Sequence, residues 1–120
     1  MKLVNSAVGY YFRSRHTRID NYLNNPIGTQ EKVFKDLIHK AKDTAWGKKY
    51  DYASISDIKT FAERVPVGDY ETHKPFINEM MHGKPDILWP GITRWFSKSS
   101  GTTSDKSKFI PVSEENLDTC

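Results

Sequence analysis

Apolar residues recur at spacings of three and four along the first third of the chain, which is the pattern of amphipathic helices. The first such stretch covers residues 7–23, and Asn24-Asn25-Pro26 should end it because the residue before a proline avoids helical angles. The second stretch should run from Gln30 to Trp46, with Thr29 as its N-cap. We expect residues 7–46 to form a helical hairpin, two antiparallel helices joined by a short Pro-Gly turn. The expected buried face of the second helix comprises Val33, Phe34, Leu37, Ile38, Ala41 and Ala45.

Glycines, prolines and polar caps predict the remaining helix boundaries. Gly47 stands where a left-handed residue would close the second helix. Residues 54–82 should contain two short helices, one from Ser56, its cap, to Arg64, and one capped by Asp69 and running through Met81. Gly83 and Pro85 close that segment.

The periodicity changes after residue 87, where short β-prone runs replace the helical pattern. Ile87–Gly91 should be an extended stretch that ends in a turn, and residues 93–97 and 108–112 are β-prone runs rich in aromatic or β-branched side chains. A polar Ser/Thr/Gly loop separates the last two runs, so residues 87–112 should form β-strands with a hairpin-like unit around loop 99–108. Residues 113–120 begin another helix, capped by Ser113, that has barely started at Cys120.

These elements predict an α+β fold, with a mostly helical portion of about four helices and a small β-hairpin that carries the loop. The chain has 120 residues, which allows one domain, and 37% of them are apolar. That fraction is low for a complete domain. Either the fold is elongated or part of its core lies in sequence beyond residues 1–120, and the helix that starts at 113–120 favours the second explanation. We expect an incomplete part of a larger domain.

Charge and cysteine content narrow the class of protein. The net charge is +3, with ten basic against four acidic residues in 1–50 and eight against eleven in 51–120. The basic half could meet an anionic partner, but its charges alternate with apolar residues at helical spacing, which favours a solvated helix surface. The pI of 8.9 and the lack of a nucleic-acid motif argue against a nucleic-acid partner. One cysteine, no signal-peptide pattern and no membrane-spanning run predict a cytoplasmic protein without a membrane role.

Histidine and tryptophan positions suggest structural roles. His16, His39, His73 and His82 have no metal-ligand spacing, so we expect no metal site among them. Trp46, Trp89 and Trp95 should be core anchors.

The loop at 99–108 has the composition of a phosphate-binding site. Gly101 allows close backbone approach, and successive N–H groups can form an anion nest. Lys106 and Lys108 supply positive charge, and the hydroxyl donors are Ser99, Ser100, Thr102, Thr103 and Ser104. It is not a Walker A motif, because Asp105 stands where that motif needs glycine before its lysine. A flexible linker would have a similar composition, but the position between two β-prone runs favours a functional loop.

The sequence Ser-Ser-Gly-Thr-Thr-Ser-Asp-Lys-Ser-Lys-Phe-Ile-Pro-Val at 99–112 resembles the first nucleotide-binding motif of the auxin-responsive acyl acid–amido synthetase family, within the adenylate-forming, luciferase-like superfamily. Residues 41–50, 65–71 and 87–91 resemble further segments of that family, in the same order. The resemblance extends from about residue 10 to the end of the chain. It implies that this chain is an N-terminal fragment of the large adenylation domain.

The resemblance also implies a reaction. Ser99, Ser100, Gly101, Thr102, Thr103 and Ser104 would wrap the phosphates of ATP, with Lys106 or Lys108 adding charge. A carboxylic acid would form an acyl-adenylate, and an amine, typically an amino acid, would then displace AMP. Mg²⁺ would bridge the phosphates. Many family members have glycine in place of Asp105, and an acidic side chain there is unfavourable beside triphosphate unless it points outward or contacts a metal.

No catalytic residue is expected within this chain, since the family's adenine-, acyl- and metal-binding motifs lie downstream. The chain alone should therefore be inactive. Two alternatives remain: an adenylating enzyme that transfers the acyl group to a thiol such as coenzyme A, and a non-catalytic helical interaction module. The chain could also self-associate through apolar surface that the rest of the domain would cover.

Overall fold

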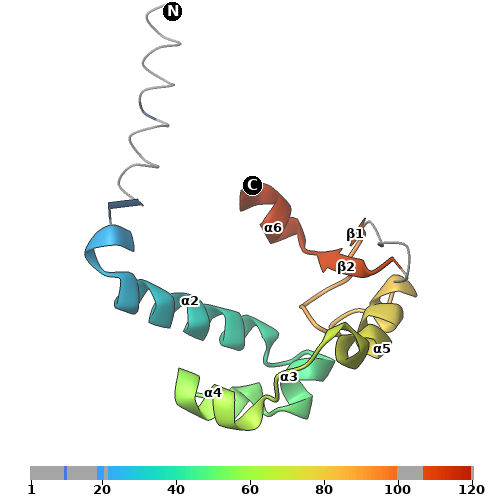
Figure 1. Cartoon of the computed structure of the whole chain (residues 1–120), viewed down its shortest axis with the longest axis horizontal. Coiled ribbons are helices and arrows are strands. Elements are labelled where there is room, and N and C mark those ends of the chain that lie inside the picture. The colour runs from blue at the N-terminus through green and yellow to red at the C-terminus, as the bar shows by residue number, and fades with distance from the viewer. Residues whose placement is uncertain (1–9, 11–18, 21, 100–106, 120) are drawn as a thin grey trace, which may run out of the picture. The chain divides into compact units, whose positions relative to one another are not determined.

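The structure is a computed structural model that describes residues 10, 19, 20, 22–99 and 107–119 (Figure 1). The chain divides into two compact units, residues 1–35 and 36–120. Most of the helix expected at 7–23 lies outside the described residues, and those of its residues that are described are helical. The mostly helical character and the β-hairpin are confirmed. Within the described residues the helical segments outnumber the four expected, because one expected helix is divided and a short 3₁₀ helix is added.

Helix α2, Pro26–Ala41, starts earlier than the expected Gln30. Pro26 begins the helix, because the first position of a helix needs no N–H donor and suits the fixed φ of proline. Asn25 is the capping residue in place of Thr29, and its Oδ1 accepts a hydrogen bond of 3.1 Å from the Gly28 N–H. A proline that looked like a stop for the preceding helix is the start of this one.

The helix expected to reach Trp46 ends at Ala41, and a second helix, α3 (Ala45–Lys49), follows a tight turn. Thr44 makes this turn and is 1% exposed. Its Oγ1 donates to the Ala41 carbonyl at 2.7 Å and accepts from the Gly47 N–H at 3.0 Å. A buried hydroxyl thus completes the end of one helix and the cap of the next.

Gly47 is not the left-handed closing residue that its position suggested. It lies buried inside α3, where an added Cβ would lie 2.0 Å from the Ala41 carbonyl oxygen. Glycine is required here by the close approach of two backbones. The division of the helix also changes the expected buried face: Ile38 and Ala41 are buried, whereas Val33, Leu37 and Ala45 are exposed. An apolar stripe shows which face can be buried but not which element covers it.

The core of residues 36–120 is built around Trp46. The indole Nε1–H donates to the Tyr52 hydroxyl at 3.1 Å, in the 3₁₀ helix η1 (Tyr52–Ser54). Burial raises the pKa of the Tyr52 phenol, an effect that the hydrogen bond from Trp46 partly offsets. The centroid of the Trp46 ring lies 4.8 Å from that of His73 and 5.1 Å from that of Phe76, which it meets edge-on. The other buried apolar side chains are Ile38, Ala41, Ile55, Ile77, Met80 and Ile87.

Two further helices start at aspartate caps. Helix α4, Ile58–Arg64, is capped by Asp57 and not by the expected Ser56, since the Asp57 carboxylate accepts from the Thr60 N–H at 2.8 Å. Helix α5, Tyr70–Met81, has the expected bounds, and its cap Asp69 accepts from the Thr72 N–H at 3.0 Å. These backbone hydrogen bonds lower the pKa of both capping carboxyls.

Residues 87–91 are irregular and form no strand, contrary to expectation. The reason is a small closed loop between Asp86 and Gly91. The Asp86 N–H donates to the Gly91 carbonyl at 3.0 Å, and the Asp86 carboxylate accepts from the Gly91 N–H at 2.7 Å. The carbonyls of Asp86 and Ile87 accept from the first two N–H groups of α3, so this segment satisfies helix donors and does not pair with a strand.

The β-hairpin has the expected form. Strand β1, Trp95–Lys98, pairs with β2, Phe109–Val112, in antiparallel register, with Trp95 opposite Val112 and Lys98 opposite Phe109. Contacts link β2 to α5, and the two lie close together in Figure 1. Trp95 is 58% exposed and is therefore not the core anchor expected from its residue type.

Helix α6, Glu114–Thr119, follows the hairpin, and the Ser113 Oγ accepts from the Asn116 N–H at 3.2 Å, as expected for a cap. Across the described ranges, no helix combines the length and apolarity needed to cross a membrane.

Candidate phosphate-binding loop

The hairpin places the two ends of loop 99–108 next to each other. Of the residues expected to bind phosphate, the structure describes Ser99 and Lys108. The others lie outside the described residues: Ser100, Gly101, Thr102, Thr103, Ser104 and Lys106. The site geometry that can be described is therefore that of the residues at which the loop leaves β1 and enters β2.

Two hydrogen bonds between Ser99 and Lys108 close the loop. The Ser99 N–H donates to the Lys108 carbonyl at 2.9 Å, and the Lys108 N–H donates to the Ser99 Oγ at 3.1 Å. The first bond extends the β-ladder by one residue pair, and the second uses the serine hydroxyl as the acceptor. A hydroxyl that accepts one hydrogen bond still has its own O–H to donate, so closing the loop leaves Ser99 a donor for a bound anion.

A third contact connects the loop exit to helix α5. The Phe109 N–H donates a hydrogen bond of 3.0 Å to the Tyr70 hydroxyl, which lies outside the sheet. The Lys108 Nζ lies 5.8 Å from the centroid of the Tyr70 ring, within the range of a cation–π interaction. Tyr70 is half-buried and is the first residue of α5. No local sequence pattern indicates the role of Tyr70, because the two residues that it contacts are 38 and 39 positions away.

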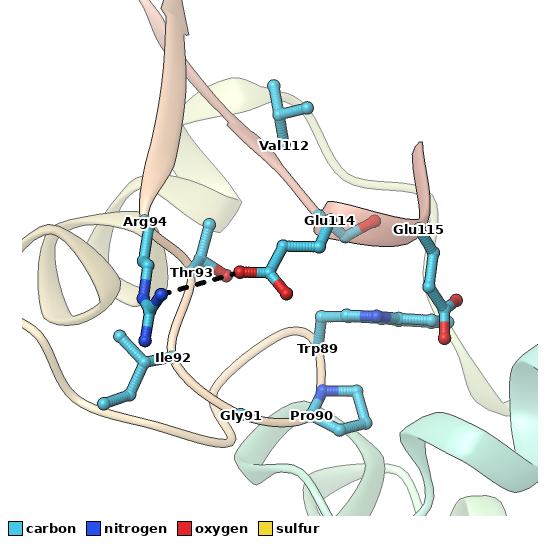
Figure 2. A pocket seen from close by; sticks show the side chains of 10 residues that line it. Trp89, Pro90, Gly91, Ile92, Thr93, Arg94, Val112, Glu114 and Glu115 are labelled. Atoms are coloured by element: carbon cyan, nitrogen blue, oxygen red, sulfur yellow. Dashed lines mark ion pairs between the residues drawn. The ribbon is translucent and has the colours of Figure 1, made fainter. Parts of the chain in front are cut away.

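Two hollows lie beside the end of the hairpin away from loop 99–108, both within residues 36–120. One of about 390 Å³ is shown in Figure 2, and the other measures about 430 Å³. They share Trp89, Thr93, Val112 and Ser113.

Charged groups face each other across the first hollow. Arg94, just before β1, points toward Glu114 at the start of α6, with 3.9 Å between guanidinium nitrogen and carboxylate oxygen (Figure 2). Both side chains are exposed, so this ion pair contributes little to stability. Glu115 forms a second ion pair, 3.0 Å long, with Lys40 near the end of α2. The described parts of the chain contain no group of three His, Cys, Asp or Glu side chains that could hold a metal ion.

The chain matches the N-terminal domain of the GH3 family over residues 15–120 and belongs to that family. Among curated proteins, it is 36% identical over 102 residues to the indole-3-acetic acid-amido synthetase GH3.2 of Arabidopsis thaliana, covering 83% of this chain and 18% of that protein. It is 30% identical over 102 residues to the Arabidopsis indole-3-acetic acid-amido synthetase GH3.3, covering 83% of this chain and 17% of the relative. A probable indole-3-acetic acid-amido synthetase of Oryza sativa, GH3.13, is 43% identical over 60 residues, which are 48% of this chain and 13% of the relative. The chain thus spans less than a fifth of the length of these relatives.

Proposed function

We propose that this chain is the N-terminal, phosphate-binding part of an ATP-dependent acyl acid–amido synthetase. The observation that carries the proposal is the Ser/Thr/Gly loop 99–108, closed at its base by the paired hydrogen bonds of Ser99 and Lys108. Membership of the GH3 family, and relatives named as amido synthetases, support the choice of reaction.

The closed base suits triphosphate binding. Ser99 and Lys108 hold the two ends of the loop next to each other, and the N–H groups of a loop with this composition could converge on one anion. The hydroxyls of Ser99, Ser100, Thr102, Thr103 and Ser104 would add donors, Gly101 would allow close approach, and Lys106 and Lys108 would add charge. Mg²⁺ bound together with the nucleotide would offset the negative charge of its phosphates.

The proposed reaction has two steps. A carboxylate oxygen attacks the α-phosphorus of ATP, and pyrophosphate leaves. The nitrogen of an amine, for which the names of the relatives favour an amino acid, then attacks the acyl carbon, loses a proton and displaces AMP. The loop contributes by binding and orienting the phosphates and by stabilising charge on the leaving pyrophosphate.

Nucleotide binding is testable on the chain itself, whose 120 residues suit amide-resolved NMR. Titration with Mg·ATP should shift the amide signals of residues 99–108. The triple variant Ser100→Ala, Thr102→Ala, Thr103→Ala should weaken binding at least about tenfold, since each lost hydroxyl removes a hydrogen bond to a charged group. Equal affinity in the triple variant would refute the phosphate-binding role and favour the helical interaction module.

The choice of acceptor can be tested on the full-length protein that carries this chain, supplied either with amino acids or with coenzyme A. We expect amide products and no thioester. A thioester product would refute the amido synthetase and favour the alternative enzyme that transfers the acyl group to a thiol.

A further inference from the structure

Tyr70 connects helix α5 to the exit of the phosphate loop through both of its chemical groups. Its hydroxyl accepts the Phe109 N–H at 3.0 Å, and its ring lies 5.8 Å from the Lys108 ammonium. The two contacted residues are consecutive and stand where the loop enters β2. One side chain therefore holds both the backbone and the cation at the loop exit.

The start of helix α5, from which Tyr70 extends, is itself held in place. Asp69, immediately before it, caps α5 through the Thr72 N–H at 3.0 Å and the Thr72 hydroxyl at 2.9 Å. Further along the same helix, Ile77 and Met80 are buried in the core at 4% and 3% exposure. Tyr70 thus extends from a helix that the core holds in place, whereas the loop exit depends on a hairpin of two four-residue strands. Short hairpins are marginally stable unless they pack on another element.

We propose that Tyr70 is a positioning residue for the phosphate loop, a role that rests on the proposed function. Its hydroxyl holds Phe109, the first residue of β2. Together with the Ser99–Lys108 pair, this contact fixes the positions of the two ends of the loop. Its ring holds the Lys108 side chain beside the loop exit, so the charge of Lys108 is placed by a contact with helix α5. Without Tyr70 the Phe109 N–H and the Lys108 ammonium at the loop exit would lose these contacts, and holding the loop exit in place for triphosphate would cost more.

Two substitutions separate the contributions of hydroxyl and ring. Tyr70→Phe keeps the ring and removes the acceptor of the Phe109 N–H, which should weaken Mg·ATP binding about fivefold, the usual effect of one lost neutral hydrogen bond. Tyr70→Leu also removes the aromatic face and should weaken binding a further twofold to fivefold or so. Exchange of the Phe109 amide with solvent deuterium should accelerate in both variants.

A matched control is available in the same unit. Tyr52→Phe also deletes a tyrosine hydroxyl that accepts a hydrogen bond, here the 3.1 Å bond from Trp46 Nε1 in the core. This variant should lower the urea midpoint of unfolding without changing the affinity for Mg·ATP or the exchange of the Phe109 amide. A loss of affinity that merely follows global stability would appear in both tyrosine variants.

The closing experiment titrates Mg·ATP into the unsubstituted 120-residue chain, Tyr70→Phe, Tyr52→Phe and the loop triple variant, with amide NMR as the readout. The expected order of affinity is the unsubstituted chain and Tyr52→Phe together, then Tyr70→Phe, then the triple variant. If Tyr70→Phe binds as tightly as the unsubstituted chain while the triple variant loses binding, the positioning role is overturned and the phosphate loop stands. If the triple variant binds as well as the unsubstituted chain, or if the unsubstituted chain does not bind, the phosphate-loop proposal fails and the role of Tyr70 fails with it.

Discussion

Replacing Thr44 with valine should destabilise the chain strongly, although the two side chains have nearly the same shape. The Thr44 hydroxyl is buried and makes two hydrogen bonds, one to the Ala41 carbonyl at 2.7 Å and one from the Gly47 N–H at 3.0 Å. Valine can make neither. The Ala41 carbonyl would keep a second partner, the Thr44 N–H at 3.1 Å, but the buried Gly47 N–H would lose the threonine acceptor.

These contacts allow the magnitude to be worked out. Loss of the bond to Ala41 should cost about 1 kcal/mol, and leaving the Gly47 N–H without its acceptor should cost about 1–3 kcal/mol. The sum is about 2–4 kcal/mol, a large part of the stability of a small domain. For a chain of this size we expect the midpoint of thermal unfolding to fall by about 10 °C.

Urea unfolding followed by far-UV circular dichroism measures this effect, with Thr44→Ser as the matched control. Serine keeps the hydroxyl and removes one methyl group, which should cost about 1 kcal/mol. We expect the serine variant to be clearly more stable than the valine variant. A valine variant as stable as the serine variant, or within about 0.5 kcal/mol of the unsubstituted chain, would show that the hydroxyl does not hold this turn.

Three further predictions concern the turn, the helix caps and the activity of the isolated chain. Gly47→Ala should destabilise by more than about 2 kcal/mol in urea unfolding, because its Cβ would collide with the Ala41 carbonyl and neither backbone can move easily; a neutral result would contradict the close approach. The lowered pKa of Asp57 and Asp69 means that their contribution to stability is full above the ordinary carboxyl pKa and is lost as pH falls through the lower pKa of the folded state. The double variant Asp57→Asn, Asp69→Asn should therefore flatten the fall of the urea midpoint below about pH 4 while keeping the helices capped at neutral pH; an unchanged acid slope would count against it. The 120-residue chain alone should release no pyrophosphate from ATP when given carboxylic acids, and measurable release would disprove the expectation that its catalytic partners lie elsewhere.

Several features of the fold could be predicted because they depend on residues close together in the chain. Asp69 identified the start of α5, since a capping carboxylate needs only the N–H groups of the next turn. The hairpin followed from two β-prone runs around a polar loop. Ser113 likewise identified the start of α6. Each of these signals lies within a few residues of the structure that it determines.

Other features depend on contacts between separate segments of the backbone. The residue type of Gly47 suggested a left-handed helix end, but its role is to admit the Ala41 carbonyl. Residues 87–91 looked like a strand, but the carbonyls of Asp86 and Ile87 serve the first N–H groups of α3. In both cases the same residues fit two local structures, and the packing partner decides between them.

For the candidate site, residue types alone define the chemistry of the loop, with hydroxyl donors, a glycine and two lysines between two β-prone runs. Tertiary structure decided what holds that loop, through the closure between Ser99 and Lys108 and the contact of Tyr70 with Phe109. The physical reason is that residue type defines which bonds a group can make, whereas a bond between residues 70 and 109 exists only after the core has brought α5 to the hairpin.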